Sequence, residues 1–145
     1  MSIEQNKKVV EEYFECMRQL DVDRLEPHLA ETFTWIVPVR SKALAHLAYP
    51  RNKKVALERM RTIFSGMTKK PEFKILSMTA EDDRVHAEAD GRMFWKNGQV
   101  MENQYHHAFV FRDGKIDKCT EYCDFLAIFE ADPMVAKDAM EPKKG

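Results

Sequence analysis

The sequence has almost no net charge, which argues against several classes of binding partner. Among its 145 residues, 23 Lys and Arg stand against 24 Asp and Glu, a formal net charge of -1. No global field therefore attracts nucleic acid or an anionic membrane. The basic clusters are short and contain no aromatic residues, so we expect solvated surface rather than a nucleic-acid groove. They are Arg51-Asn52-Lys53-Lys54, Lys69-Lys70 and Lys143-Lys144.

Hydrophobic runs of membrane-spanning length are also missing. The first residues, MSIEQNKK, contain no hydrophobic segment of a signal peptide. Cys16, Cys119 and Cys123 are odd in number and show no CxxC spacing, which is typical of reduced thiols. We therefore expect a cytoplasmic protein with no membrane partner.

Motifs for metals and cofactors are absent as well. No glycine-rich phosphate loop, nucleophile elbow or dinucleotide fingerprint occurs. On one strand, Cys119 and Cys123 would lie roughly 13 Å apart, too far to bind a single zinc ion. The sequence predicts no metal site and no cofactor, so any chemistry must rest on side chains.

The length fits one domain with a core of its own. No repeat, low-complexity segment or linker divides the chain. We expect a single domain over 1–145, with a core at about 3–125 and a C-terminal segment at 126–145. In that segment, Asp132-Pro133 opens a short helix and the tail beyond Glu141 is loose.

Apolar residues at helical spacing predict helices in the first half of the chain. Ser2 and Gln5 form a capping-box pattern, and Asn52 is a second N-cap candidate. The expected elements are a helix at about 3–20, a helix at 22–31, a strand at 33–37, a loop at 39–51 with one helical turn at 43–47, and a helix from Asn52 to about Gly66.

The second half of the chain alternates as strands. Asn97-Gly98 and Asp113-Gly114 are hairpin signals, because glycine takes positive φ without a Cβ penalty. The expected strands lie at about 72–80, 84–96, 99–112 and 115–125. Helices followed by an antiparallel meander indicate an α+β fold. A long curved sheet with helices on one face forms a cone whose mouth is a ligand pocket.

One face of the strand at 99–112 has the composition of a pocket wall. Alternation places five side chains there: Asn103, Tyr105, His107, Phe109 and Phe111. A solvated face would not hold two phenylalanines, and an ordinary core face would not hold an imidazole. The strand at 84–96 adds a small-residue face that fits a pocket floor, made of Val85, Ala87, Ala89, Gly91 and Met93.

The opposite face of the sheet is expected to be open, because helices cover only one side. A partly apolar patch on it predicts a homodimer through this outer face. Its residues are Phe94, His106, Ala108, Val110 and Tyr122.

The position of Glu121 depends on the turn at Asp113-Gly114. A two-residue turn pairs Arg112 with Lys115 and sets Thr120 and Tyr122 beside His107. A three-residue turn with a glycine bulge instead sets Cys119, Glu121 and Cys123 on that face. Alternation alone leaves both versions open.

Three segments carry a resemblance to a known family. They are the first helix with Tyr13 ahead of Leu20-Asp21-Val22-Asp23, the Trp35-Ile36-Val37-Pro38 strand end, and the run from Tyr105 to Asp124. On these, residues 3–125 resemble the nuclear transport factor 2-like superfamily, in its SnoaL-like and ketosteroid isomerase-like branch. The resemblance implies a cone-shaped α+β barrel with N-terminal helices packed on a strongly curved antiparallel sheet. It also favours the bulged turn.

The resemblance to the steroid isomerases is partial. Tyr13 falls where those enzymes keep an oxyanion-hole tyrosine, and His107 falls where they keep a second oxyanion donor. The position of their carboxylate base looks like Val37, before Pro38. Without that base, a ketosteroid isomerase of the usual mechanism is not expected.

The candidate catalytic residues are His107, Glu121 and Tyr13. His107 suits proton transfer because its ordinary pKa lies near neutral pH. Glu121 would orient it or act as a second acid or base, with Tyr13 and Tyr105 as hydrogen-bond donors. Each has a structural alternative: a hydrogen-bonded core histidine, a cross-strand salt bridge and a core aromatic ring. Further ligand-contacting candidates are Trp35, Met93, Tyr105, Phe109, Asp124 and His46, the last in a loop that would roof the cone.

These expectations give two hypotheses for function. The first is a cofactor-independent acid/base enzyme of the isomerase, dehydratase (lyase) or cyclase type, acting on a small apolar ligand with hydroxyl or carbonyl groups. The second is a non-catalytic protein that binds a small ligand in the same cone.

Overall fold

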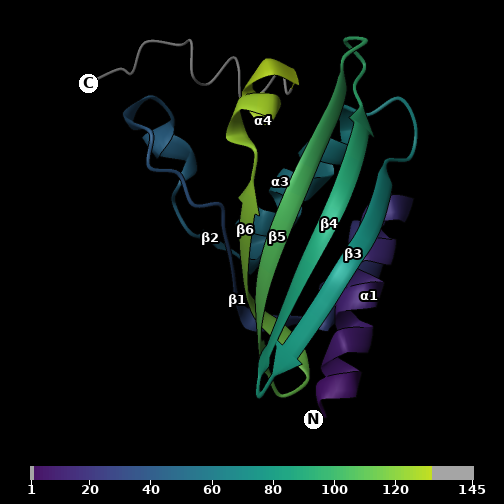
Figure 1. Ribbon diagram of the computed structural model, residues 1–145, viewed down its shortest axis with the longest axis vertical. Helices are drawn as coiled ribbons and strands as arrows, with labels where there is room; N and C mark the ends of the chain where they lie inside the picture. Colours follow the sequence, from purple (N-terminus) through teal and green to yellow (C-terminus); the bar gives the residue numbers. More distant parts are fainter. Residues whose placement is uncertain (1, 132–145) are drawn as a thin grey trace.

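Six strands form one curved sheet, and helices α1 and α3 cover one of its faces (Figure 1). The computed structural model describes residues 2–131, apart from the side chains of Ala43 and His46. The elements are α1 (Ile3–Gln19), α2 (Val22–Leu25), η1 (Glu26–His28), β1 (Leu29–Ile36), η2 (Lys42–Leu47), β2 (Arg51–Asn52), α3 (Lys53–Ser65), β3 (Glu72–Glu81), β4 (Arg84–Phe94), β5 (Val100–Arg112), β6 (Lys115–Cys123) and α4 (Phe125–Ala131).

Helix α1 begins and ends where its sequence indicates. The Ser2 hydroxyl accepts a hydrogen bond from the Gln5 amide at 3.2 Å, and the Ser2 amide donates to Gln5 Oε1 at 2.9 Å. This reciprocal pair is the predicted capping box. At the other end, Leu20 takes a left-handed conformation with φ 55 and closes the helix. The predicted helix at 3–20 is therefore confirmed.

The helix predicted at 22–31 is too long. Helix α2 stops at Leu25, η1 follows with Pro27 in its first turn, and β1 begins at Leu29. Proline supplies no amide hydrogen, so an α-helix cannot continue through this position without losing a hydrogen bond. Leu29 and Phe33, both fully buried, then anchor β1 in the core.

The cone-shaped α+β fold is confirmed, although its sheet is mixed rather than purely antiparallel. The strand order is β2-β1-β6-β5-β4-β3, and β1 runs parallel to β6. All other pairings are antiparallel. β1 belongs to the helical half of the chain, so it returns to the sheet beside the last strand instead of extending the meander.

The turn between β5 and β6 combines features of both predicted versions. Arg112 pairs with Lys115, so the turn has two residues, and Asp113 and Gly114 take positive φ. A bulge follows at Asp117, because Phe111 pairs with Ile116 while Val110 pairs with Lys118. The three-residue turn that the resemblance favoured is not formed, but this bulge still brings Cys119, Glu121 and Cys123 to the face of His107.

The core lies between the concave face of the sheet and the helices. The five alternate residues of β5, from Asn103 to Phe111, are all buried as predicted. Strand β6 ends at Cys123, and residue 125 begins α4 instead of extending the strand. The helix and tail expected from Asp132 onward lie outside the described residues. Within them, no helix is both long and apolar enough to cross a membrane.

Candidate active site

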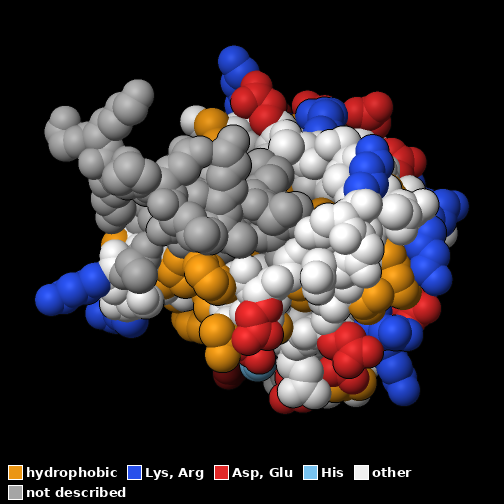
Figure 2. Space-filling model, turned by 90° about the horizontal axis from the view of Figure 1, so that it is seen from above, with side chains coloured by type: hydrophobic (Ala, Val, Ile, Leu, Met, Phe, Trp, Pro, Cys, Tyr) orange, Lys and Arg blue, Asp and Glu red, His pale blue; other side chains and the backbone are white. Residues whose placement is uncertain are grey.

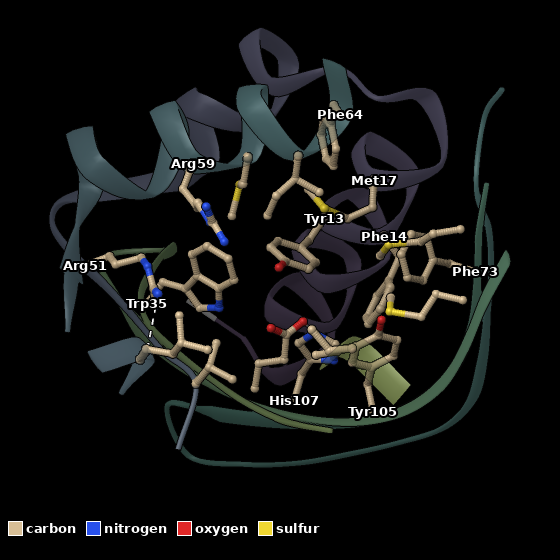
Figure 3. A pocket seen from close by; sticks show the side chains of 18 of the residues that line it. Tyr13, Phe14, Met17, Trp35, Arg51, Arg59, Phe64, Phe73, Tyr105 and His107 are labelled. Atoms are coloured by element: carbon tan, nitrogen blue, oxygen red, sulfur yellow. Dashed lines mark hydrogen bonds and ion pairs between the residues drawn. The ribbon is translucent and has the colours of Figure 1, made fainter. Parts of the chain in front are cut away.

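A cavity opens between the concave face of the sheet and helices α1, α3 and α4 (Figure 3). Its volume is about 120 Å³. Most of its wall is apolar. The helices contribute Phe14, Met17, Met60, Ile63, Phe64 and Phe125. The cavity therefore fits a small molecule with a largely apolar body.

The charges at this end of the molecule are mixed in sign. Seen from above, Lys, Arg, Asp and Glu side chains are distributed around the edge, and hydrophobic side chains gather inside it (Figure 2). No region of one sign dominates this view, which agrees with the near-zero net charge.

His107 and Glu121 meet on the sheet side of the cavity. They are directly opposed on β5 and β6, and His107 Nε2 lies 3.2 Å from Glu121 Oε1. The Glu121 side chain keeps 17% of its surface exposed, whereas His107 keeps 4%. The carboxylate is therefore the more accessible member of the pair.

Aromatic rings enclose the imidazole of His107. Phe109 stacks on it at 5.7 Å and 9°, and Phe14 meets it edge-on at 5.2 Å. Its second nitrogen, Nδ1, is buried and has no hydrogen-bond partner among the described residues. A carboxylate oxygen accepts hydrogen bonds, so the tautomer with a hydrogen on Nε2 donates to Glu121. The contact thus fixes the orientation of the ring.

Tyr13 reaches the same region from α1. Its ring lies edge-on to Phe109 at 5.1 Å and to His107 at 6.0 Å. Burial raises the pKa of the Tyr13 phenol well above 10.0, and charge on Cys119 and Glu121 acts in the same direction. The phenol therefore stays protonated and donates its hydrogen bond to Cys119. Because sulfur is a weak acceptor, a ligand oxygen can compete for this donor.

Two arginines at the other side of the cavity were missed by the sequence argument. Arg51, assigned to a solvated basic cluster, is buried on β2 beside Trp35 of β1, while Arg59 reaches the cavity from α3 (Figure 3). Arg51 lies 5.0 Å from the centroid of the Trp35 ring and 4.5 Å from that of Tyr49. A two-residue strand carries no periodic signal, so nothing in the sequence marked Arg51 as buried.

The structure brings together most of the residues that the sequence singled out. Tyr13, Trp35, Met93, Tyr105, His107 and Glu121 all line the cavity. Phe109 is fully buried beneath it and contacts no open space. Gly91 does not form an open floor, because a Cβ there would meet the rings of Phe73 at 2.8 Å and Tyr105 at 2.9 Å.

Asp124 lies outside the cavity wall and has a structural position. Its backbone amide donates to Asn103 Oδ1 at 2.9 Å, and its carboxylate accepts from the Ala127 amide at 3.2 Å. Asp124 therefore links the end of β6 to the start of α4. His46 lies in η2, and its side chain is outside the described part of the chain.

No cluster of three or more His, Cys, Asp or Glu side chains suited to a metal ion occurs in residues 2–131. Cys119 is buried against Tyr13, and Cys123 follows four residues later on the same strand.

Solved structures share this fold over nearly their whole length. An NTF2-like protein of unknown function from Burkholderia pseudomallei K96243 is 15% identical with a TM-score of 0.76, covering 92% of this chain and 99% of that one. A putative SnoaL-like polyketide cyclase from Jannaschia sp. CCS1 is 19% identical with a TM-score of 0.73, covering 98% and 97%. An LEH-like epoxide hydrolase from M. tuberculosis is 17% identical with a TM-score of 0.71, covering 88% and 89%.

Identities this low establish the fold and leave the reaction open. No curated protein is significantly similar in sequence. The model of the SnoaL-like domain matches residues 10–118, which runs from α1 into β6 and includes Tyr13 and His107. The chain therefore belongs to the SnoaL-like domain family.

Proposed function

We propose that this protein is a cofactor-independent enzyme that moves a proton on a small apolar ligand, as isomerases, dehydratases and cyclases do. One observation carries the proposal. His107 Nε2 and Glu121 Oε1 lie 3.2 Å apart inside a largely apolar cavity. Such a pair supplies a carboxylate with a fixed proton donor next to it, which is the arrangement that acid/base catalysis needs.

Glu121 is the group that meets the ligand, and His107 positions it. The carboxylate is the more exposed member, whereas stacked and edge-on rings enclose the imidazole. The roles are therefore the reverse of those expected from the sequence. In an isomerisation, Glu121 accepts a proton from one ligand atom and returns it to another, so no co-reactant is consumed.

Tyr13 supplies a neutral hydrogen-bond donor for negative charge that develops on a ligand oxygen. Its raised pKa keeps the proton on the phenol, and its acceptor is the Cys119 sulfur. A donor of this kind stabilises an enolate or alkoxide more than the ground-state carbonyl. Enzymes named among the structural relatives, a putative polyketide cyclase and an epoxide hydrolase, support a small-molecule reaction in this type of cone.

The decisive experiment compares Glu121→Gln and His107→Ala with the native protein on a substrate found by screening small carbonyl, hydroxyl and epoxide compounds. Glu121→Gln keeps the shape of the side chain and removes the base, so turnover should fall by about two to four orders of magnitude. His107→Ala removes the group that orients the carboxylate and should also lower turnover. His106→Ala is the matched control, because His106 is the neighbouring histidine on β5 and its side chain lies on the exposed face of the strand.

Native turnover in the Glu121→Gln protein on that substrate would contradict the proposal. The non-catalytic alternative has its own support, since the wall is mostly apolar and aromatic rings enclose His107. Tight binding of the screened compounds without any turnover would establish a binding protein instead.

A further inference from the structure

The side of the cavity next to Trp35 is rich in hydrogen-bond donors that have no acceptor. Arg51 is 5% exposed, and its Nε and Nη1 atoms have no hydrogen-bond partner among the described residues. The indole Nε1 of Trp35 is likewise buried and unpartnered there. The register of β1 and β2 makes Trp35 and Arg51 direct neighbours. Three N–H groups on two neighbouring side chains thus have no hydrogen-bond acceptor among the described residues.

The positive charge of Arg51 also has no ion-pair partner in the described part of the chain. No Asp or Glu there forms an ion pair with it, and its Nη2 donates a hydrogen bond to the Leu47 carbonyl at 3.2 Å. The rings of Trp35 and Tyr49 stabilise the guanidinium in part. Burial nevertheless lowers the pKa of Arg51. The positive charge of Arg59 adds to this effect, whereas Tyr49 and Glu121 oppose it in part.

Removing one partner from a buried ion pair is strongly destabilising, because it leaves a charge desolvated without compensation. An anionic group of a ligand would supply the carboxylate partner that Arg51 lacks among the described residues. Guanidinium presents its N–H groups as a planar fork that matches a carboxylate with two parallel hydrogen bonds. The Trp35 indole adds a third donor at the same end.

We propose that the ligand is a small carboxylic acid whose carboxylate binds Arg51 and Trp35 and whose apolar body extends toward Glu121 and His107. This inference rests on the proposed function in that it uses the same cavity, and it names the substrate class. Arg59 contributes a second positive charge on the α3 side, so the anionic end of the ligand is held on one side of the cavity and the reacting end on the other. The structure thus assigns a direction to the bound ligand.

The test measures binding by calorimetry and needs no knowledge of the reaction. Each probe pair is an acid and its neutral amide: benzoate with benzamide, 3-phenylpropanoate with 3-phenylpropanamide, and 4-phenylbutanoate with 4-phenylbutanamide. The native protein should bind at least one acid more than about tenfold more tightly than its amide, the worth of one charged hydrogen-bond pair. Arg51→Met should remove this preference and leave the amide affinity unchanged.

Arg61→Met is the matched control, because Arg61 lies on the outer side of α3 and pairs with Asp23. It should keep the native preference. Thermal unfolding adds a readout that a purely structural arginine would not give. Without ligand, Arg51→Met should be at least as stable as the native protein. The preferred acid should raise the Tm of the native protein and leave the Tm of Arg51→Met unchanged. Should Arg51→Met fail to fold, Arg51→Lys keeps the charge without the fork and should show a reduced preference.

Equal affinity for acids and amides in the native protein, or binding of none of the acids, would overturn the inference. So would an undiminished preference in Arg51→Met or Arg51→Lys. Glu121→Gln should retain the acid preference whether or not it abolishes turnover. The inference and the proposed function can therefore fail separately.

Discussion

His107 and Glu121 stand opposite each other on adjacent strands, and their contact joins Nε2 to Oε1 at 3.2 Å. Both side chains project from long ladders of β5 and β6 rather than from loops. Backbone hydrogen bonds on either side therefore hold the pair in place before any ligand arrives. Substitutions of His107 or Glu121 should therefore change the chemistry of the pair without changing the register of the sheet.

Replacing Tyr13 with Phe should lower turnover by about two to three orders of magnitude, the usual effect of removing one oxyanion donor. The fold should change little, because the lost hydrogen bond runs to the Cys119 sulfur, and an ordinary hydrogen bond contributes only about 1 kcal/mol. Steady-state kinetics and denaturant unfolding measure the two effects. Tyr122→Phe, which changes an exposed tyrosine of β6, is the control. Unaltered turnover in Tyr13→Phe would remove this residue from the mechanism.

Alkaline pH should destabilise the protein through its buried thiols and phenol. Burial raises the pKa of Cys16 from 9.0 to about 11, and it raises the pKa of Cys119 and of Tyr13. A group whose pKa is higher in the folded state keeps its full stabilising effect below the unfolded value and loses it as pH rises. The unfolding free energy should thus begin to fall near pH 9, with the Tyr13 contribution starting near pH 10, by at most about 1.4 kcal/mol per pH unit for each group.

Urea unfolding at pH 8, 9, 10 and 11 measures this loss. Cys16→Ala should flatten the curve between pH 9 and 11, because alanine has no thiol to ionise in the unfolded chain. An unfolding free energy that is constant up to pH 11 would show that these groups ionise alike in the folded and unfolded states.

The sequence predicted the parts of the fold that depend on local signals. The capping box at Ser2, the turn at Asp113-Gly114 and the alternation along β5 each arise from residues close together in the chain, and all three are present. The alternation along β5 also predicted that the His107 side chain faces the cavity. Local patterns also placed Asn52 as the N-cap of α3, where its side chain accepts from the Val55 amide at 3.0 Å.

Features that depend on distant pairing could not be predicted in this way. The bulge at Asp117 inserts one extra residue into β6. Because side chains alternate with the same period before and after it, the sequence pattern does not reveal where the strand changes face. The parallel pairing of β1 with β6 and the burial of Arg51 both join segments far apart in the chain. Arg51 was therefore not predicted at the donor-rich end of the cavity, although Trp35 beside it was.

Replacing Gly91 with Ala should reduce stability by about 1–3 kcal/mol, the usual penalty for overpacking. The added Cβ would lie 2.8 Å from the Phe73 ring and 2.9 Å from the Tyr105 ring, which pack against each other with centroids 6.1 Å apart. Denaturant unfolding measures the loss. Phe73→Leu in the same chain should recover part of it, because a smaller side chain relieves the clash. Additive effects of the two substitutions would refute this explanation.

The last prediction concerns the outer face of the sheet, where we propose that two copies of the chain associate. No helix covers this face in residues 2–131 (Figure 1). Tyr122 is 52% exposed on it, and His86 and His106 contact each other there at 3.1 Å. Two copies related by a two-fold axis would bury this mixed surface against itself. Sedimentation velocity at micromolar concentration should therefore give twice the chain mass of 17.0 kDa.

Tyr122→Glu should shift this equilibrium to the monomer, because a two-fold interface would bury two additional carboxylates without partners. Leu126→Glu is the matched control, since Leu126 is an apolar side chain of α4 with 65% of its surface exposed and lies off the outer face. It should remain dimeric. A native protein that sediments as a monomer would contradict the proposed interface, and a dimer that survives Tyr122→Glu would place the contact elsewhere on the surface.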